Sequence, residues 1–333
     1  MRPEIGLGFQ SDKRSEDYAR LAQAAEGHGF DVLSVYSDLM YQPPIFPLLV
    51  MAAHTQRVRL GPACLNPYSL APYEIAGQTA ALDLASNGRA YLGLARGTWL
   101  AAVGIDQAAP VATIREALEV IRRLLAGDDS GFSGDRFRLD PGTAFRYRPL
   151  RPDPPLMIGT WGPRTSALAG ELANEVKIGG SANPDMVAVA RKHIGVGAEA
   201  CGRDPEDIRI VMGAVTVVDH DGEAARAKAR TEVAMYLAVV AGLDPTFDVP
   251  ASLLEGVRDL ISRGAHEEAG ALIPDEVLDR FAFAGTPSQV AEHARALLEA
   301  GAGRVEFGTP HGLTDAGGVE LLGSEVLPRL RRA

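Results

Sequence analysis

The sequence predicts an α/β fold, a (β/α)8 TIM barrel with insertions, in one domain over residues 1–333. Short apolar segments alternate with helical patterns along nearly the whole chain. Strands that are separated by helices run parallel, and a parallel sheet needs cover on both faces. Eight such units in this length indicate a closed barrel. An open doubly wound sheet is the alternative, but Ser11 stands where the dinucleotide-binding turn after a first strand has its last glycine.

The predicted strands are the eight short apolar segments, at residues 4–9, 32–36, 58–63, 90–95, 156–159, 176–179, 209–218 and 304–308. Four apolar residues at helical spacing share one face of the first predicted helix: Tyr18, Leu21, Ala22 and Ala25. Gly27 and Gly29 end that helix. Further helices are expected at 46–54, 71–85, 114–125, 163–172, 184–200, 223–240 and 291–298, and residues 319–330 close the chain.

Two insertions interrupt the alternation. Residues 128–155 are rich in Gly, Pro, Arg and aromatic side chains, and 132–137 is expected to pair with 145–147 in a small hairpin. Residues 242–283 contain helical pieces and no strand pattern, so we expect a helical insertion there.

Composition excludes several classes of protein. The net charge is −10 and the basic residues are scattered, which argues against nucleic acid as a partner. No apolar run of 18 residues and no signal peptide are present, so we expect no membrane span. Cys64 and Cys201 are far apart in the sequence, which suits a reducing cytoplasm. The seven histidines lack zinc-ligand spacing, so we expect no metal.

A strand, a tight turn and a helix start follow one another at residues 155–164. Gly159 and Gly162 allow close approach of the backbone to a ligand, and Pro163 suits the first helical turn. The free N–H groups of the helix start and the charge of Arg164 favour an anion. This pattern predicts a phosphate site, with a purely structural turn as the alternative.

The predicted active site lies where the strands end, as in other barrels of this kind. The candidate residues at these ends are Asp38, Ala63, Cys64, Asn66, Tyr68, Arg96, Gly97, Thr98, Trp99, Gly159, Thr160, Trp161, Gly162, Arg164, Gly179, Gly180 and Ser181. They include few acid–base groups and no nucleophile with a base. Small residues, amides and aromatic rings are better suited to a flat phosphorylated cofactor that performs the chemistry itself.

Each side chain also has a structural interpretation. Asp38, the candidate catalytic residue, either contacts the cofactor ring or donates a proton, or it only caps a helix. Asn66 either bonds the cofactor ring or fixes the turn before Pro67, and Arg96 either pairs with the ring or with a surface carboxylate. The backbone of Cys64 is expected to matter more than its thiol. Trp161 is either a pocket wall or part of the core.

Three motifs in order resemble the bacterial-luciferase-like superfamily, and within it the coenzyme F420-dependent methylenetetrahydromethanopterin reductase branch. The motifs are Gly61-Pro62-Ala63-Cys64-Leu65-Asn66-Pro67-Tyr68, Asn87-Gly88-Arg89-Ala90-Tyr91-Leu92-Gly93-Leu94 and Ile158-Gly159-Thr160-Trp161-Gly162-Pro163-Arg164. The resemblance implies coenzyme F420 as cofactor, and a non-prolyl cis peptide at Ala63–Cys64 that supports the deazaflavin ring. It implies that the cofactor phosphate lies near residues 159–162 and 179–181.

The sequence departs from this branch at two positions. Gly8 stands where the pterin reductases have a glutamate, and Ser37-Asp38 stands where an Asp-His pair is common. We therefore expect an F420-dependent oxidoreductase that transfers a hydride to or from a small organic substrate other than methylenetetrahydromethanopterin. An FMN-dependent monooxygenase and a non-catalytic flavin-binding barrel are the alternatives. A homodimer is expected by analogy.

Overall fold

Eight parallel strands form a nearly closed barrel within residues 2–331, the part of the chain that this computed structural model describes. They are β1 (Glu4–Phe9), β2 (Val32–Val35), β3 (Arg59–Pro62), β4 (Leu92–Ala95), β7 (Leu156–Gly159), β8 (Glu175–Gly179), β9 (Arg209–Val218) and β11 (Arg304–Gly312). Paired strands follow the order β3, β2, β1, β11, β9, β8, β7, β4. The sheet closes between β3 and the start of β4, where the Tyr91 amide donates to the Leu60 carbonyl at 2.9 Å. The predicted barrel is confirmed.

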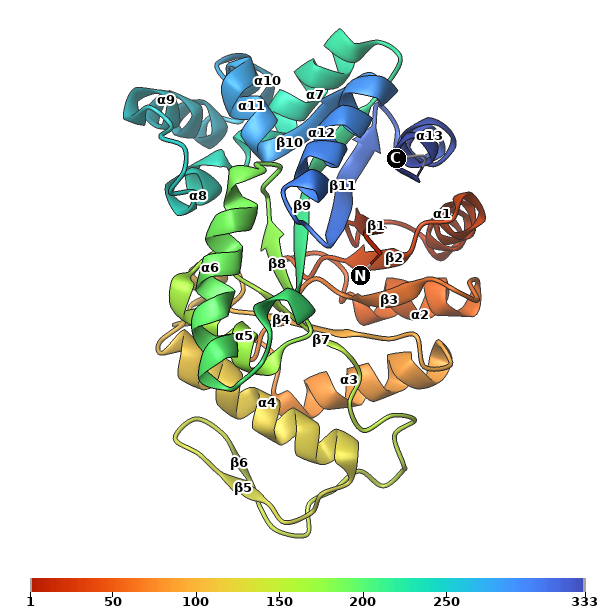
Figure 1. Cartoon of the computed structure of the whole chain (residues 1–333), viewed down its shortest axis with the longest axis vertical. Helices are drawn as coiled ribbons and strands as arrows, with labels where there is room; N and C mark the ends of the chain where they lie inside the picture. Colours follow the sequence, from red (N-terminus) through yellow and green to blue (C-terminus); the bar gives the residue numbers. More distant parts are fainter. Residues whose placement is uncertain (1, 332–333) are drawn as a thin grey trace.

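Helices cover the outside of the strands (Figure 1). They are α1 (Ser15–His28), α2 (Ile45–Ala53), α3 (Pro72–Ala85), α4 (Pro110–Ala126), α5 (Pro163–Leu172), α6 (Asp185–Ala200), α7 (Gly222–Ala234), α12 (Pro287–Glu299), α13 (Asp315–Leu321) and α14 (Leu327–Arg331). The apolar face predicted for α1 is buried, and the helix ends at Gly29, whose φ of 94° is left-handed. Gly27 lies inside the helix, so it does not end it.

The small hairpin differs from the prediction. β5 (Phe132–Ser133) pairs with β6 (Arg138–Leu139), and residues 145–147 form no strand. The turn between β5 and β6 is held from a distance, because the Glu116 carboxylate on α4 accepts hydrogen bonds from the backbone amides of Asp135, Arg136 and Phe137. Local sequence patterns carry no sign of such a distant partner.

The region from residue 235 to 285 contains a strand that the sequence analysis missed. After α8 (Leu237–Val240), α9 (Ala251–Ser262), α10 (His266–Ala271) and α11 (Asp275–Phe281), the strand β10 (Ala282–Gly285) pairs with the end of β9. The expectation of helices without a strand was therefore wrong. The apolar run passes from α11 into β10 without a turn residue, so periodicity does not separate helix from strand there. The single helix predicted for 223–240 is likewise divided, because α7 ends at Ala234.

These added helices share a second hydrophobic cluster with α7, β9 and β10, which includes Val233, Leu237, Val257, Val277 and Phe281. Figure 1 shows α8 to α11 together at one end of the molecule, whereas the β5–β6 hairpin lies at the other end. The assignment of the whole chain to a single domain stays a prediction.

The inside of the barrel is filled by polar as well as apolar side chains. Alternate residues of a strand point to the same face, so Glu175 and Lys177 on β8 and Arg304 and Glu306 on β11 all point inward. Glycines on neighbouring strands make room for them and for aromatic rings. A Cβ on Gly61, for example, would lie 2.6 Å from the ring of Tyr91.

Candidate active site

A cavity of about 650 Å³ opens at the carboxyl ends of the barrel strands. Its walls include Asp38, Ala63, Gly179 and Gly180 among the residues that the sequence analysis selected for the site. Thr98 and Trp99 after β4 also line it. The ends of β2, β3, β4 and β8 therefore meet around one hollow, which is where the active sites of (β/α)8 barrels lie, while the predicted residues after β7 do not line it.

The end of β3 has the backbone geometry that the family resemblance implied. The peptide bond Ala63–Cys64 is cis. The Cys64 side chain is half-buried, and its sulfur would lie 2.9 Å from a Cβ on Gly159. Burial raises the pKa of the Cys64 thiol to about 11, so this cysteine is protonated at neutral pH and is a poor nucleophile.

Asp38 lies on the cavity wall beyond β2. Its carboxylate accepts a hydrogen bond from Gln10 Nε2 at 3.1 Å. Burial raises the pKa of Asp38, and the Gln10 hydrogen bond and the nearby Lys177 charge oppose this shift. A half-buried carboxyl group with a raised pKa is suited to proton transfer.

Two further groups of this site escaped the sequence analysis. Lys177 lines the cavity floor, and its ammonium donates a hydrogen bond to the buried carboxylate of Glu306. Tyr36 also lines the cavity, with the Lys177 Nζ 5.2 Å from the centroid of its ring. The phenol of Tyr36 occupies the space above Gly8, where an added Cβ would lie 2.2 Å from its oxygen. Charged residues at alternate positions of buried strands were the available signal for the lysine and the glutamate.

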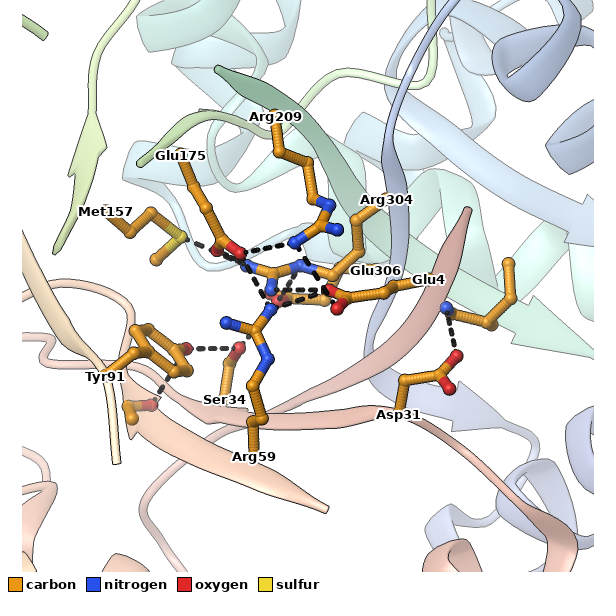
Figure 2. Close-up of polar contacts among 12 residues, drawn as sticks. Glu4, Asp31, Ser34, Arg59, Tyr91, Met157, Glu175, Arg209, Arg304 and Glu306 are labelled. Carbon is orange, nitrogen blue, oxygen red and sulfur yellow. Dashed lines mark hydrogen bonds and ion pairs between the residues drawn. The ribbon is translucent and has the colours of Figure 1, made fainter. Parts of the chain in front are cut away.

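A buried ionic network continues from Glu306 toward the amino ends of the strands (Figure 2). Arg304 contacts Glu175 at 2.9 Å, and Arg59 contacts both Glu175 at 2.7 Å and Glu4 at 2.6 Å. Burial opposes ionisation of Glu175, but the surrounding arginines outweigh it and lower its pKa to about 2. On the other side of the network, Ser34 Oγ donates to Glu306 at 2.6 Å and bonds Tyr91 Oη at 2.7 Å.

The turn between β7 and α5 has the predicted local structure. Gly162 is the N-cap of α5 and Pro163 is its first residue, while the Gly162 amide donates to Thr160 Oγ1 at 3.1 Å. Gly162 and Arg164 are exposed, so the helix start and the guanidinium are open to an anion. Trp161 is half-buried, and its Nε1 donates to the Gly179 carbonyl at 2.9 Å, which ties this turn to the end of β8.

The glycine turn after β8 is held from inside the protein. The amides of Gly180 and Ser181 both donate to the Gly213 carbonyl, at 2.6 and 3.1 Å. Ser181 is fully buried, and its Oγ accepts from the Asn183 amide. These groups shape the cavity wall, but their own N–H donors are already used.

Asn66, Arg96 and Gly97 lie beside one another without lining the cavity. The Asn66 side chain is 4% exposed, and its carbonyl oxygen accepts hydrogen bonds from the amides of Tyr68 and Ser69. That is the turn-fixing role that the sequence analysis left open. Arg96 is exposed, and an added Cβ on Gly97 would lie 3.1 Å from the Asn66 amide group.

The described residues contain no group of three His, Cys, Asp or Glu side chains that could hold a metal ion. No helix among residues 2–331 is both long and apolar enough to cross a membrane.

Comparisons with known proteins match the chain over almost its full length. A family model for the luciferase-like monooxygenases matches residues 4–304. The 5,10-methylenetetrahydromethanopterin reductase of Archaeoglobus fulgidus is 29% identical and covers 98% of this chain and 100% of the relative. The F420-dependent glucose-6-phosphate dehydrogenase of Nakamurella multipartita is 28% identical, over 99% of this chain and 97% of the relative. The solved coenzyme F420-dependent tetrahydromethanopterin reductase of Methanopyrus kandleri superposes with a TM-score of 0.88 at 26% identity, over 99% of this chain and 100% of that one.

Proposed function

Since this chain belongs to the luciferase-like monooxygenase family, we propose that it is a coenzyme F420-dependent oxidoreductase. It transfers a hydride between C5 of the deazaflavin and a small organic substrate. The observation that carries the proposal is the cavity of about 650 Å³ at the carboxyl ends of the strands, next to an exposed helix start. A flat ring and a phosphate need such a combination. Two relatives that match nearly the whole chain are named as F420-dependent enzymes.

The residues present fit this cofactor in two ways. Ala63 at the end of β3 faces the cavity with small side-chain bulk, which leaves a backbone surface for the ring. The start of α5 offers free amides and the charge of Arg164 to a phosphate. When bound, the cofactor supplies the hydride chemistry, and the protein binds and orients the two reactants and excludes water.

The remaining selected residues keep the roles that their positions support. Asp38 is the proposed catalytic group, since it lines the cavity and its pKa is raised. The proposed cofactor contacts are Ala63, Cys64, Asn66, Arg96, Gly97, Gly159, Thr160, Trp161, Gly162, Arg164, Gly179, Gly180 and Ser181. Asn66 and Ser181 act indirectly in this proposal, by fixing the turns that the cofactor meets.

Methylenetetrahydromethanopterin is not the proposed substrate. The position of the pterin reductases' glutamate is Gly8 here, and the Tyr36 phenol fills the space that a side chain on this residue would need. An FMN-dependent monooxygenase is the second candidate, because the matching family model is described by that activity. We further propose that the protein acts in the cytoplasm as a homodimer.

Titration of the purified protein with F420 and with FMN, followed by fluorescence quenching, separates these candidates. Micromolar or tighter binding of F420 with weaker binding of FMN supports the proposal, and the reverse order supports the monooxygenase. If neither molecule binds, the protein is not a flavin-type enzyme and the proposal fails.

The position of the phosphate is tested by Gly162→Asp. A Cβ on Gly162 meets nothing closer than Thr160 Oγ1 at 3.9 Å, so the fold accepts the new side chain. Its negative charge at the helix start should weaken F420 binding by about 100-fold or more. Gly162→Asn, which has the same shape without the charge, should lose less. Gly27→Asp on the exposed face of α1 is the matched control, since a Cβ there has no neighbour within 4 Å. Unchanged F420 affinity in Gly162→Asp would contradict this placement.

A further inference from the structure

Lys177 is a buried lysine with hydrogen-bonding capacity to spare. Its side chain is 7% exposed, and its partner Glu306 is not exposed at all. Among residues 2–331, the Glu306 carboxylate is the one hydrogen-bond acceptor of the Lys177 ammonium. An ammonium group has three donors, so two N–H bonds of Lys177 remain for another acceptor. Because Lys177 lines the cavity, that acceptor can be a bound molecule.

The surroundings hold this ammonium in a fixed position. Glu306 is itself fixed by Ser34 Oγ at 2.6 Å. A Cβ on Gly213 would lie 3.4 Å from Lys177 Cε, so the lysine chain lies against the backbone of β9. The ring of Tyr36 covers another side, 5.2 Å from the Nζ. A donor fixed in this way loses little conformational freedom when a ligand binds.

The charges around the cavity disfavour an anionic substrate. The titratable residues on its walls, other than tyrosines, are Asp12, Lys13, Asp38, Lys177, Glu232 and Asp315, which are four acids and two bases. Lys13 is engaged with Asp12 at 2.6 Å and Asp315 at 2.9 Å. The charge of Lys177 is balanced by Glu306. Carboxyl groups therefore outnumber ammonium groups on the cavity walls, which disfavours a phosphate or carboxylate group there.

Two carboxyl groups on the walls form no ion pair within the described residues, although Lys177 lies near Asp38 and Lys228 lies near Glu232. Asp38 has the Gln10 amide, and Glu232 on α7 has no hydrogen-bond or ion-pair partner within residues 2–331. Burial raises the pKa of both groups. The α5 start and Arg164, which are proposed to hold the cofactor phosphate, lie outside this cavity lining, whereas Gly179 and Gly180 form part of its wall.

We propose that Lys177 binds the oxygen atom of an uncharged carbonyl or alcohol substrate, and that phosphorylated and carboxylated molecules are excluded. This inference rests on the proposed function and names the substrate class of the same site. Addition of a hydride to a carbonyl carbon moves the electron pair of the π bond onto oxygen, and a fixed ammonium at that oxygen stabilises the charge. The hydride comes from C5 of reduced F420, which is left oxidised, and the oxygen takes a proton from the carboxyl group of Asp38, the proposed acid on the same cavity wall, which completes the alcohol.

Binding without turnover is the first test, with cyclohexanone as the probe in a ligand-observed NMR titration. Lys177→Met should weaken cyclohexanone binding about tenfold, because the ketone oxygen loses one hydrogen bond from a charged donor. Lys177→Arg retains a donor and should lose less. Lys192→Met on the exposed side of α6 is the matched control and should bind like the wild type. Glucose 6-phosphate should bind the wild type more weakly than cyclohexanone.

Turnover is the second test. With reduced F420 and cyclohexanone, Lys177→Met should lower kcat/KM by about 100-fold or more, while the Kd for F420 changes less than about threefold. Lys177→Met removes the ammonium partner of Glu306 and leaves it with Ser34 and the more distant Arg304. The double variant K177M/E306Q, which removes both charges, is therefore measured beside it. Both variants should show the same fall in kcat/KM if the Lys177 ammonium acts as the hydrogen-bond donor to the substrate.

Three results would overturn the inference. The first is that Lys177→Met and K177M/E306Q bind cyclohexanone as tightly as the wild type does. The second is that the wild type does not bind cyclohexanone at all. The third is that the wild type binds glucose 6-phosphate more tightly than cyclohexanone. Failure of the wild type to bind F420 is a different result. It contradicts the proposed function, while the NMR titration still reports on Lys177.

Discussion

The two ends of the barrel interior use the same residue types in opposite ways. At the amino ends of the strands, Glu175 lies among arginines, and its pKa falls to about 2. At the carboxyl ends, Asp38 faces a cavity with one amide as hydrogen-bond partner, and its pKa rises. A buried carboxylate with cationic partners is held in its ionised form and has little tendency to exchange protons. A buried carboxyl group without an ion-pair partner exchanges protons more readily. The comparison separates charges that organise the barrel from charges that act on ligands.

The largest expected effect tests the amino-terminal end. Arg304→Met should lower the free energy of unfolding by about 3–5 kcal/mol, because it leaves the buried carboxylates of Glu175 and Glu306 without their shared partner. Urea denaturation followed by circular dichroism measures this. A loss below about 1 kcal/mol would mean that the network does not organise the barrel.

The pH dependence of stability tests the same end. The pKa of Glu175 is lowered from an ordinary 4.5 to about 2 in the folded protein. The unfolded chain therefore takes up the proton first as the pH falls, and the contribution of Glu175 is present above pH 4.5 and is lost between pH 4.5 and 2. The contribution is of order 3 kcal/mol.

Urea denaturation at a series of pH values shows this loss in the wild type. In Glu175→Gln, whose side chain does not titrate, the slope of stability against pH should be smaller over the same window. Parallel curves for the two proteins would contradict the assignment.

At the cavity end, Asp38→Asn should act on catalysis and leave the fold intact. We expect kcat/KM to fall about 100-fold, the usual contribution of a general acid or base, with no change in the Kd for F420. In the wild type, the acidic limb of the pH profile of kcat/KM should lie above the ordinary aspartate value of 3.8, and Asp38→Asn should remove it. Retention of that limb in the variant would assign it to another group, with Glu232 the next candidate.

The smallest expected effect serves as a baseline for both ends. Arg263 pairs with Asp259 at 3.0 Å on the outside of α9, and both side chains are more than half exposed. Arg263→Met should change the free energy of unfolding by less than about 0.5 kcal/mol. A larger change would mean that simple loss of an arginine, and not its burial, explains the result for Arg304.

Sequence patterns were sufficient to predict those structural features that depend on neighbouring residues in the chain. The eight barrel strands were located within a few residues because each is a short apolar run between helical patterns. Gly162 and Pro163 were correctly placed at the start of α5, since glycine and proline have fixed backbone preferences. The cis bond at Ala63–Cys64 came from the family resemblance, and apolar periodicity alone gives no sign of it.

What the sequence did not provide depends on pairing in space. Lys177 and Glu306 are 129 positions apart and meet only because β8 and β11 both flank β9. The β5–β6 turn is held by Glu116 on α4, and β10 pairs with the C-terminal end of β9. Such contacts leave no periodic mark in the chain.

Part of the cavity wall is built outside the barrel strands. Met235, Tyr236, Val239 and Val240 reach the cavity from the segment that leads into α8 to α11, and that segment is packed on the second hydrophobic cluster. Substitutions or length changes there would alter which molecules fit, while the ionic interior and the β7–α5 turn stay as they are. Descendants of such a protein can therefore acquire new substrates by remodelling one peripheral unit, without evolving a new cofactor site.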